Sequence, residues 1–185
     1  MKKINNFQKF CESILLNLID NVDNHLISVI QNEVSPGGSV LEISCGNAAD
    51  SSQLRKLGYV VKCTDLDDKY VENAKEMGLD CIKHDTRDKF PFQDSQFDLV
   101  YSRLGLHYFT EDELHQILQE LKRIGKKLLI TVKLVDDIKT GKVILTEEKW
   151  LSLVGEYFEI KSSEVKEGIL YGSKTKWLEI LAKNK

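Results

Sequence analysis

The chain has 185 residues, of which 42% are hydrophobic and 30% are charged, as expected for a globular protein of one domain. Its 26 basic and 29 acidic residues give a net charge of −3, which disfavours nucleic acid as a partner. No stretch approaches the roughly 18 apolar residues of a membrane span, and the N-terminus lacks the apolar core of a signal peptide. We therefore expect a single domain over residues 1–185 that does not associate with membranes.

The cysteines indicate the redox compartment. They form no CxxC pair, no histidine lies near them at metal-binding spacing, and three of the four lie in apolar, strand-like runs. We interpret them as buried free thiols in a reducing environment, which predicts a cytoplasmic location and no metal site. The four are Cys11, Cys45, Cys63 and Cys81.

Residues 1–35 are predicted to form an N-terminal helical segment, because apolar residues recur at three- and four-residue spacing. Asp23-Asn24 is a potential break before a second stretch through Ile27 and Ile30, and Pro36-Gly37-Gly38 ends the segment. Three interpretations remain open: a lid over the site, a helix packed on the sheet, or an apolar stripe that pairs with a second copy. The chain is accordingly expected to be a monomer or a homodimer.

Residues 36–185 alternate between strand-like and helix-like patterns, which predicts a parallel sheet covered on both faces. About nine residues separate the last two strands, too few for a parallel crossover, so these strands should form an antiparallel hairpin. The predicted fold is α/β: a doubly wound, Rossmann-like, mostly parallel seven-stranded sheet with an antiparallel last strand. Strands are expected at 39–44, 59–64, 79–83, 97–102, 127–135, 157–165 and 175–182, and helices at 48–57, 67–77, from the Thr110–Glu113 capping box onward, and at 147–154.

Ligands bind beyond the carboxyl ends of the strands in open α/β sheets, so the residues after each strand are the candidates for a site. The first strand contains Glu42 and leads into a turn of small residues, Ser44 to Asn47. Gly46 would let the backbone approach a ligand closely, although a tight turn also needs glycine for structural reasons alone.

Two later strand ends carry carboxylates. Asp65 lies 19 residues after Gly46, and an acidic residue at about that spacing suits hydrogen bonds to ribose hydroxyls. The alternative is that Asp65 or Asp67 caps the following helix; Asp67 fits the cap better, which leaves Asp65 for the ligand. Asp85 follows the third strand, where it would accept from an adenine amino group or be an ordinary loop residue.

Together these residues resemble the class I S-adenosylmethionine-dependent methyltransferases, over about Val40 to Lys133. The most specific part of the resemblance is Phe90-Pro91-Phe92, then 95–100 and 104–109, which look like the fourth-strand motif of that family and its following loop. The resemblance implies S-adenosyl-L-methionine as cofactor and S-adenosyl-L-homocysteine as product. The cofactor-binding residues that it implies are Glu42, Ser44, Cys45, Gly46, Asn47, Asp65, Leu66, Asp85, Thr86 and Ser102.

The chain departs from the family at Ser44 and Ala48, where glycine is usual. Both residues are small, so binding is expected but could be weaker, and Ser44 could donate to the methionine carboxylate. The departures leave open a cofactor-binding module without catalysis. An NAD-binding enzyme is a further alternative, but it requires G-x-G-x-x-G and gives no role to Glu42 or Asp85.

A methyltransferase mainly has to position its acceptor and exclude water, because the cofactor supplies the activated methyl group. His107 is the candidate base, with a structural or cofactor-side role as the alternative. Arg103 and Lys133 would steer an anionic acceptor or be unpartnered surface charges. The pI of about 5.9 and the lack of an N-P-P-Y motif favour a small-molecule acceptor over nucleic acid. The residues expected beside the acceptor are Arg103, Tyr108, Lys133 and Tyr171.

Overall fold

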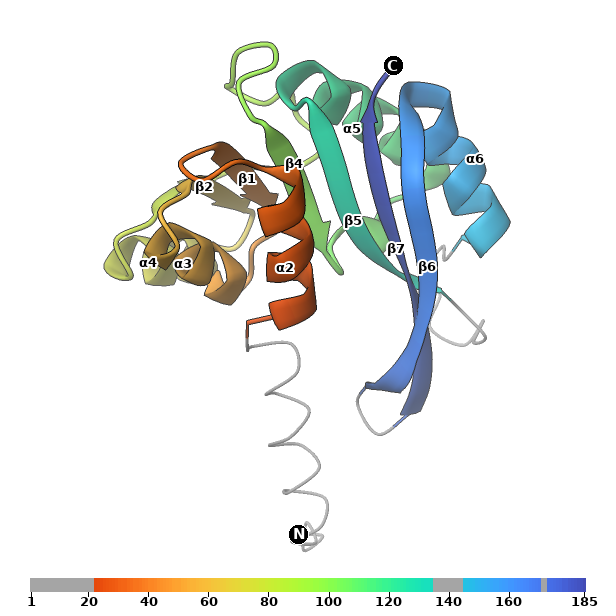
Figure 1. Cartoon of the computed structure of the whole chain (residues 1–185), viewed down its shortest axis with the longest axis horizontal. Helices are drawn as coiled ribbons and strands as arrows, with labels where there is room; N and C mark the ends of the chain where they lie inside the picture. Colours follow the sequence, from red (N-terminus) through yellow and green to blue (C-terminus); the bar gives the residue numbers. More distant parts are fainter. Residues whose placement is uncertain (1–21, 135–144, 171–172) are drawn as a thin grey trace, which may run out of the picture.

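The computed structural model describes residues 22–134, 145–170 and 173–185. Its strands are β1 (Ser39–Ile43), β2 (Val60–Asp65), β3 (Asp80–Lys83), β4 (Leu99–Arg103), β5 (Lys127–Leu134), β6 (Phe158–Leu170) and β7 (Ser173–Asn184). They form one sheet in the order β3-β2-β1-β4-β5-β7-β6 (Figure 1). The first five strands pair in parallel, and β7 runs antiparallel to both of its neighbours. The predicted sheet with its antiparallel last strand is confirmed.

Helices cover both faces of this sheet, as predicted (Figure 1). On one face lie α2 (Asn24–Glu33), α3 (Ala49–Lys56) and α4 (Asp68–Glu76), and on the other lie α5 (Glu111–Ile124) and α6 (Glu147–Tyr157). Side chains of successive strand residues point to opposite faces, so neighbouring residues of one strand enter different cores. Val40 packs under α2 and α3, whereas Leu41 packs under α5 and α6. The central strands β1, β4 and β5 are therefore buried on both faces, which leaves their ends as the places where a ligand can bind.

The predicted helix starts are confirmed by their caps. Asp23 accepts from the amides of His25 and Leu26, so α2 begins at the predicted break. The Asp67 side chain accepts from the Lys69 amide at 2.8 Å, which assigns the cap of α4 to Asp67 rather than Asp65. Thr110 and Glu113 form the expected capping box at the start of α5.

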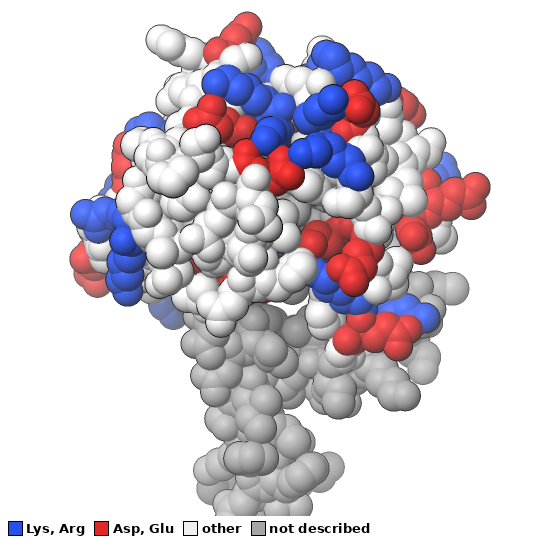
Figure 2. Space-filling model, viewed as in Figure 1, with Lys and Arg blue, Asp and Glu red and all other residues white. Residues whose placement is uncertain are grey.

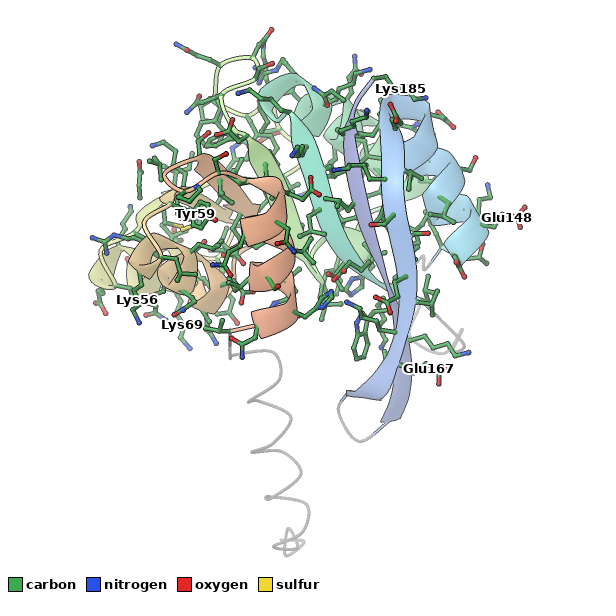
Figure 3. The ribbon with its side chains drawn as sticks, in the orientation of Figure 1. Lys56, Tyr59, Lys69, Glu148, Glu167 and Lys185 are labelled. Carbon is green, nitrogen blue, oxygen red and sulfur yellow. The ribbon has the colours of Figure 1, made fainter. Side chains whose placement is uncertain are left out.

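The described part of the N-terminal segment packs on the sheet. Leu26 and Ile30 of α2 are buried against the strands. Tyr59, labelled in Figure 3, joins the same apolar cluster, and its hydroxyl donates to the Val34 carbonyl at 3.2 Å. For α2 the flank-packed arrangement is thus observed; the lid and pairing interpretations concern residues 1–21, which lie outside the described residues. None of the helices described is long and apolar enough to cross a membrane.

Charges of both signs lie side by side on the face that Figure 2 displays. Ion pairs between neighbouring elements account for such mixing. Glu33 at the end of α2, for example, accepts from Lys127 at 2.9 Å and from Lys161 at 2.7 Å. This face therefore does not present the single positive field that attracts a polyanion.

The last hairpin is longer than predicted. β6 continues to Leu170 and β7 begins at Ser173, so two residues, not about nine, separate the strands. One of the extra pairs is Glu167 opposite Lys176, and Glu167 lies on the part of the hairpin that projects from the sheet (Figure 3). A projecting hairpin has water on both faces, so its residues need not alternate between apolar and polar. Hydrophobic alternation in the sequence therefore does not predict this part of the strands.

Candidate functional site

The strand order reverses between β1 and β4. From β1 the chain proceeds to β2 and β3 on one side, and then returns to β4 and β5 on the other. In open α/β sheets this switch point, at the carboxyl ends of the strands, is where ligands bind. The residues that follow β1, β2, β3 and β4 are therefore the candidate site, and most of the predicted residues lie there.

The turn after β1 has an unusual backbone. Ser44, Gly46 and Ala48 all have positive φ, at 54°, 52° and 52°. A side chain makes this left-handed conformation cost about 1–2 kcal/mol, which explains why glycine is usual where this chain has Ser44 and Ala48. The turn keeps its shape without glycine at these two positions.

The loop after β4 packs directly against this turn. A Cβ atom at Gly105 would lie 2.8 Å from Ser44 Cβ and 2.6 Å from Ser102 Oγ, so only glycine fits there. Ser102, a predicted cofactor residue, is fully buried under this contact. The ends of β1 and β4 are thus held together at the switch point.

Asp65 at the end of β2 is brought to the same turn. Its carboxylate accepts from the Gly46 amide at 2.9 Å and from the Asp67 amide at 3.0 Å. Each carboxylate oxygen has a second lone pair, so further hydrogen bonds to a ligand remain available. Leu66 follows with 54% of its surface exposed. An acceptor group and an exposed apolar side chain therefore adjoin the turn.

Asp85 has a partner that the sequence did not predict. Arg87 donates to it through Nε at 2.9 Å and through Nη2 at 2.6 Å. These hydrogen bonds hold the pKa of the Asp85 carboxyl at about 2, so the carboxylate is ionised at neutral pH. The neighbouring Thr86 is buried. Asp85 is thus held in an ion pair with Arg87.

Glu42 lies inside the protein rather than on an open edge. Ser51 Oγ of α3 donates to its carboxylate at 2.5 Å, and the Tyr101 hydroxyl lies 3.4 Å from Ser51 Oγ. Burial, and after it the nearby Asp50 carboxyl, together raise the pKa of Glu42 to about 7. Near neutral pH Glu42 is therefore divided between its protonated and ionised forms.

A buried ion pair lies beside Glu42. Arg103 Nε is 2.9 Å from Asp50 Oδ2, and the Asp23 amide donates to Asp50 Oδ1 at 2.7 Å. Asp50 is fully buried and 14% of the Arg103 side chain is exposed. Burial raises the pKa of Asp50, and the Arg103 charge opposes that shift. Arg103 is thus an internal partner joining β4 to α3 and the start of α2, so the interpretation of an unpartnered surface charge is wrong.

The residues predicted beside the acceptor are placed as follows. The 3-10 turn η1 (Leu106–Tyr108) follows β4, with the buried His107 ring 4.3 Å from the Tyr108 ring between centroids. Tyr108 is 61% exposed. Lys133 is half-buried on β5 opposite Trp177. Tyr171 lies outside the described residues.

Comparison with known proteins agrees with this geometry. A family described as "Methyltransferase domain" matches residues 41–128. A demethylmenaquinone methyltransferase of Leptospira interrogans is 27% identical over 174 residues, covering 85% of this chain and 64% of that enzyme, so the chain spans less than two thirds of this relative.

Solved methyltransferases share the fold. A SAM-dependent methyltransferase from Methanosarcina mazei has a TM-score of 0.73 at 20% identity, over 84% of this chain and 96% of the other. Magnesium protoporphyrin IX methyltransferase from Synechocystis, solved with bound SAH, has a TM-score of 0.71 at 15% identity, over 98% and 89%.

Proposed function

Since the chain belongs to the class I methyltransferase family, we propose that it binds S-adenosylmethionine at the turn after β1 and methylates a small-molecule acceptor. The observation that carries the proposal is the hydrogen bond between the Gly46 amide and Asp65. It joins the small-residue turn to a carboxylate at the end of the neighbouring strand. This arrangement suits a ligand that has both a polar chain and a ribose.

The residues at these strand ends fit the parts of S-adenosylmethionine. Asp65 would accept from the ribose hydroxyls, and the exposed Leu66 would pack against the adenine ring, which is apolar on its faces. Ser44 and the backbone of Cys45, Gly46 and Asn47 would line the methionine portion. The Asp85–Arg87 pair and Thr86 would lie toward the adenine end.

When bound, the cofactor supplies an activated methyl group for an in-line displacement. The residues of the chain then hold the acceptor in line and exclude water. Tyr108, exposed after β4, and Lys133 on β5 would contact the acceptor. His107 would take a proton from acceptors that lose one in the transition state. Glu42 in β1 and Ser102 in β4, both buried, would hold the turn after β1 in place.

Two observations support a small molecule as the acceptor. The Leptospira relative and the Synechocystis neighbour are named for demethylmenaquinone and magnesium protoporphyrin IX, neither of which is a polymer. The face in Figure 2 carries interspersed charges. A nucleic-acid methyltransferase would instead show steeply salt-dependent binding to RNA or DNA.

A cofactor-binding module without catalysis is the second candidate function. Ser44 and Ala48 in left-handed backbone are the observation that favours it. The two functions differ in turnover: an enzyme forms S-adenosylhomocysteine with some member of a broad acceptor panel, whereas a binding module forms none.

The Asp65→Asn variant tests the proposed site. It removes the charge but keeps the size, and each hydrogen bond to a charged group contributes about 1.5–3 kcal/mol. We expect the dissociation constant of S-adenosylhomocysteine, measured by titration calorimetry, to rise about 10- to 100-fold. Asp67→Asn is the matched control, because asparagine also caps a helix and Asp67 is not a proposed ligand. Equal affinities of Asp65→Asn and the parent chain would refute this site.

A further inference from the structure

Three of the cysteines meet in the fold although they are scattered along the chain. Cys45 lies in the turn after β1, Cys63 in β2 and Cys81 in β3, where Cys63 and Cys81 are direct register partners. Their sulfur atoms all lie within 4.8 Å of one another, and the Cys45 and Cys81 sulfurs are 3.9 Å apart. All three are free thiols and buried.

The surroundings of this thiol cluster are apolar. Ala48, Val71 and Ala74 pack around the three cysteines between the sheet and its helices. Within the described part of the chain, the group contains only sulfur ligands, without a carboxylate or imidazole. A ligand for this cluster must therefore be one that prefers sulfur.

We propose that Cys45, Cys63 and Cys81 bind one divalent thiophilic cation, such as Zn²⁺, through three thiolates. Zn²⁺–sulfur bonds of about 2.3 Å in tetrahedral geometry place the sulfurs roughly 3.8 Å apart. The 3.9 Å between the Cys45 and Cys81 sulfurs is close to that separation. Since no two of the three sulfurs are more than 4.8 Å apart, each pair would have to approach by at most about an ångström to bind the ion. Soft thiolates select Zn²⁺ and similar cations over Mg²⁺ or Ca²⁺.

The charge and coordination of such a site are consistent with its position. Each thiol gives its proton to solvent on binding, so three thiolates and one divalent cation leave one negative charge. The positive charge of Lys75 on α4 acts on Cys81 and offsets part of it, whereas the carboxyls of Asp80 and Glu42 oppose the thiolates. The fourth position would go to a small exogenous ligand, an arrangement that Zn²⁺ accepts with three protein ligands. Because Cys45 belongs to the turn, the bound ion would also fix the turn.

The test measures metal retention in the full chain. All variants carry Cys11→Ser, so that only the three clustered thiols remain. The reduced protein is loaded with Zn²⁺, dialysed, and analysed for metal, and its affinity is measured by competition with a chelator. We expect one ion per chain in the Cys11→Ser parent. Cys63→Ala and Cys81→Ala should each weaken the affinity by more than about 100-fold, since even changes in groups around the ligands cost 10–100-fold.

Thermal unfolding separates loss of the site from loss of the fold. The metal-free variants should unfold cooperatively, as the metal-free parent does. Zn²⁺ at about 100 times its dissociation constant should raise the unfolding midpoint of the parent by roughly 5–10 °C and leave those of the variants unchanged. The proposal is overturned if the parent retains no ion, or if a cooperatively folding Cys63→Ala variant retains as much as the parent. Neither outcome depends on the binding of S-adenosylmethionine.

Discussion

Replacement of Arg103 by methionine is expected to lower the free energy of unfolding by about 3–5 kcal/mol at neutral pH. The Asp50 side chain is fully buried and lies 2.9 Å from Arg103 Nε. Removing the guanidinium leaves a carboxylate in the interior without this positive charge, which costs more than the ion pair itself contributes. Thermal unfolding should show the loss as a fall in midpoint of roughly 10 °C.

Two controls identify the cause of this loss. Adding Asp50→Asn to Arg103→Met removes the buried carboxylate charge that has lost its partner, and should recover much of the free energy of unfolding. Lys149→Met breaks an exposed pair, with side chains 60% and 44% exposed and atoms 3.2 Å apart, and should cost at most about 1 kcal/mol. The Arg103→Met deficit should also shrink on acidification, because Asp50 then takes up a proton. A deficit no larger than that of Lys149→Met would contradict the buried ion pair.

The Glu42→Gln variant is expected to change how stability depends on pH. The pKa of Glu42 is about 7 in the folded protein and 4.5 ordinarily, so between these values the folded state holds a proton that the unfolded state has released. The stabilisation of the folded state that results from the raised pKa of Glu42 is fully present below pH 4.5, and it is lost as the pH rises through 7. Relative to Glu42→Gln, the parent chain should lose about 3 kcal/mol over that interval, as measured by denaturant unfolding at a series of pH values.

Glu120→Gln is the control, because the pKa of Glu120 is shifted in the opposite direction from that of Glu42. Arg123 holds the pKa of Glu120 below its usual range, so the contribution of Glu120 is present above the ordinary pKa and is lost on acidification. The free energy of unfolding of the parent minus that of the variant should thus fall with rising pH for Glu42→Gln. For Glu120→Gln the same difference should rise with pH. Parallel pH profiles of Glu42→Gln and the parent would show that Glu42 does not titrate between pH 4.5 and 7.

The sheet and its caps could be predicted because they depend on local pattern. Alternating apolar runs mark the strands, and the side chains of Asp67 and Thr110 hydrogen-bond within three residues of themselves. The turn at Gly46 and the carboxylate of Asp65 were also predictable, because each follows a strand and the ends of parallel strands meet at one edge.

The buried polar groups could not be predicted from local pattern. Asp50 and Arg103 are far apart in the sequence, and an acidic residue in the first turn of a helix ordinarily faces solvent. Only the packing of α3 on the sheet shows that Asp50 points inward, and the same holds for Ser51 beneath Glu42. The left-handed backbone at Ser44 and Ala48 was likewise hidden, because neither residue type indicates positive φ.

The thiol cluster illustrates the same limit. The spacing of Cys45, Cys63 and Cys81 has no metal-binding signature, and the sequence predicts buried free thiols without a metal. Strand register supplies the missing information: Cys63 and Cys81 become partners only when β2 and β3 pair in parallel.

Thermal unfolding of the whole chain with S-adenosylhomocysteine, S-adenosylmethionine, NAD or no ligand tests the proposed cofactor most directly. At about 100 times its dissociation constant, a ligand that binds the folded state stabilises it by about 2.7 kcal/mol, a rise of roughly 5–10 °C for a domain of this size. We predict this rise with both adenosyl compounds and no rise with NAD. No rise with either adenosyl compound at saturating concentration, or a rise with NAD alone, would contradict the proposed S-adenosylmethionine site.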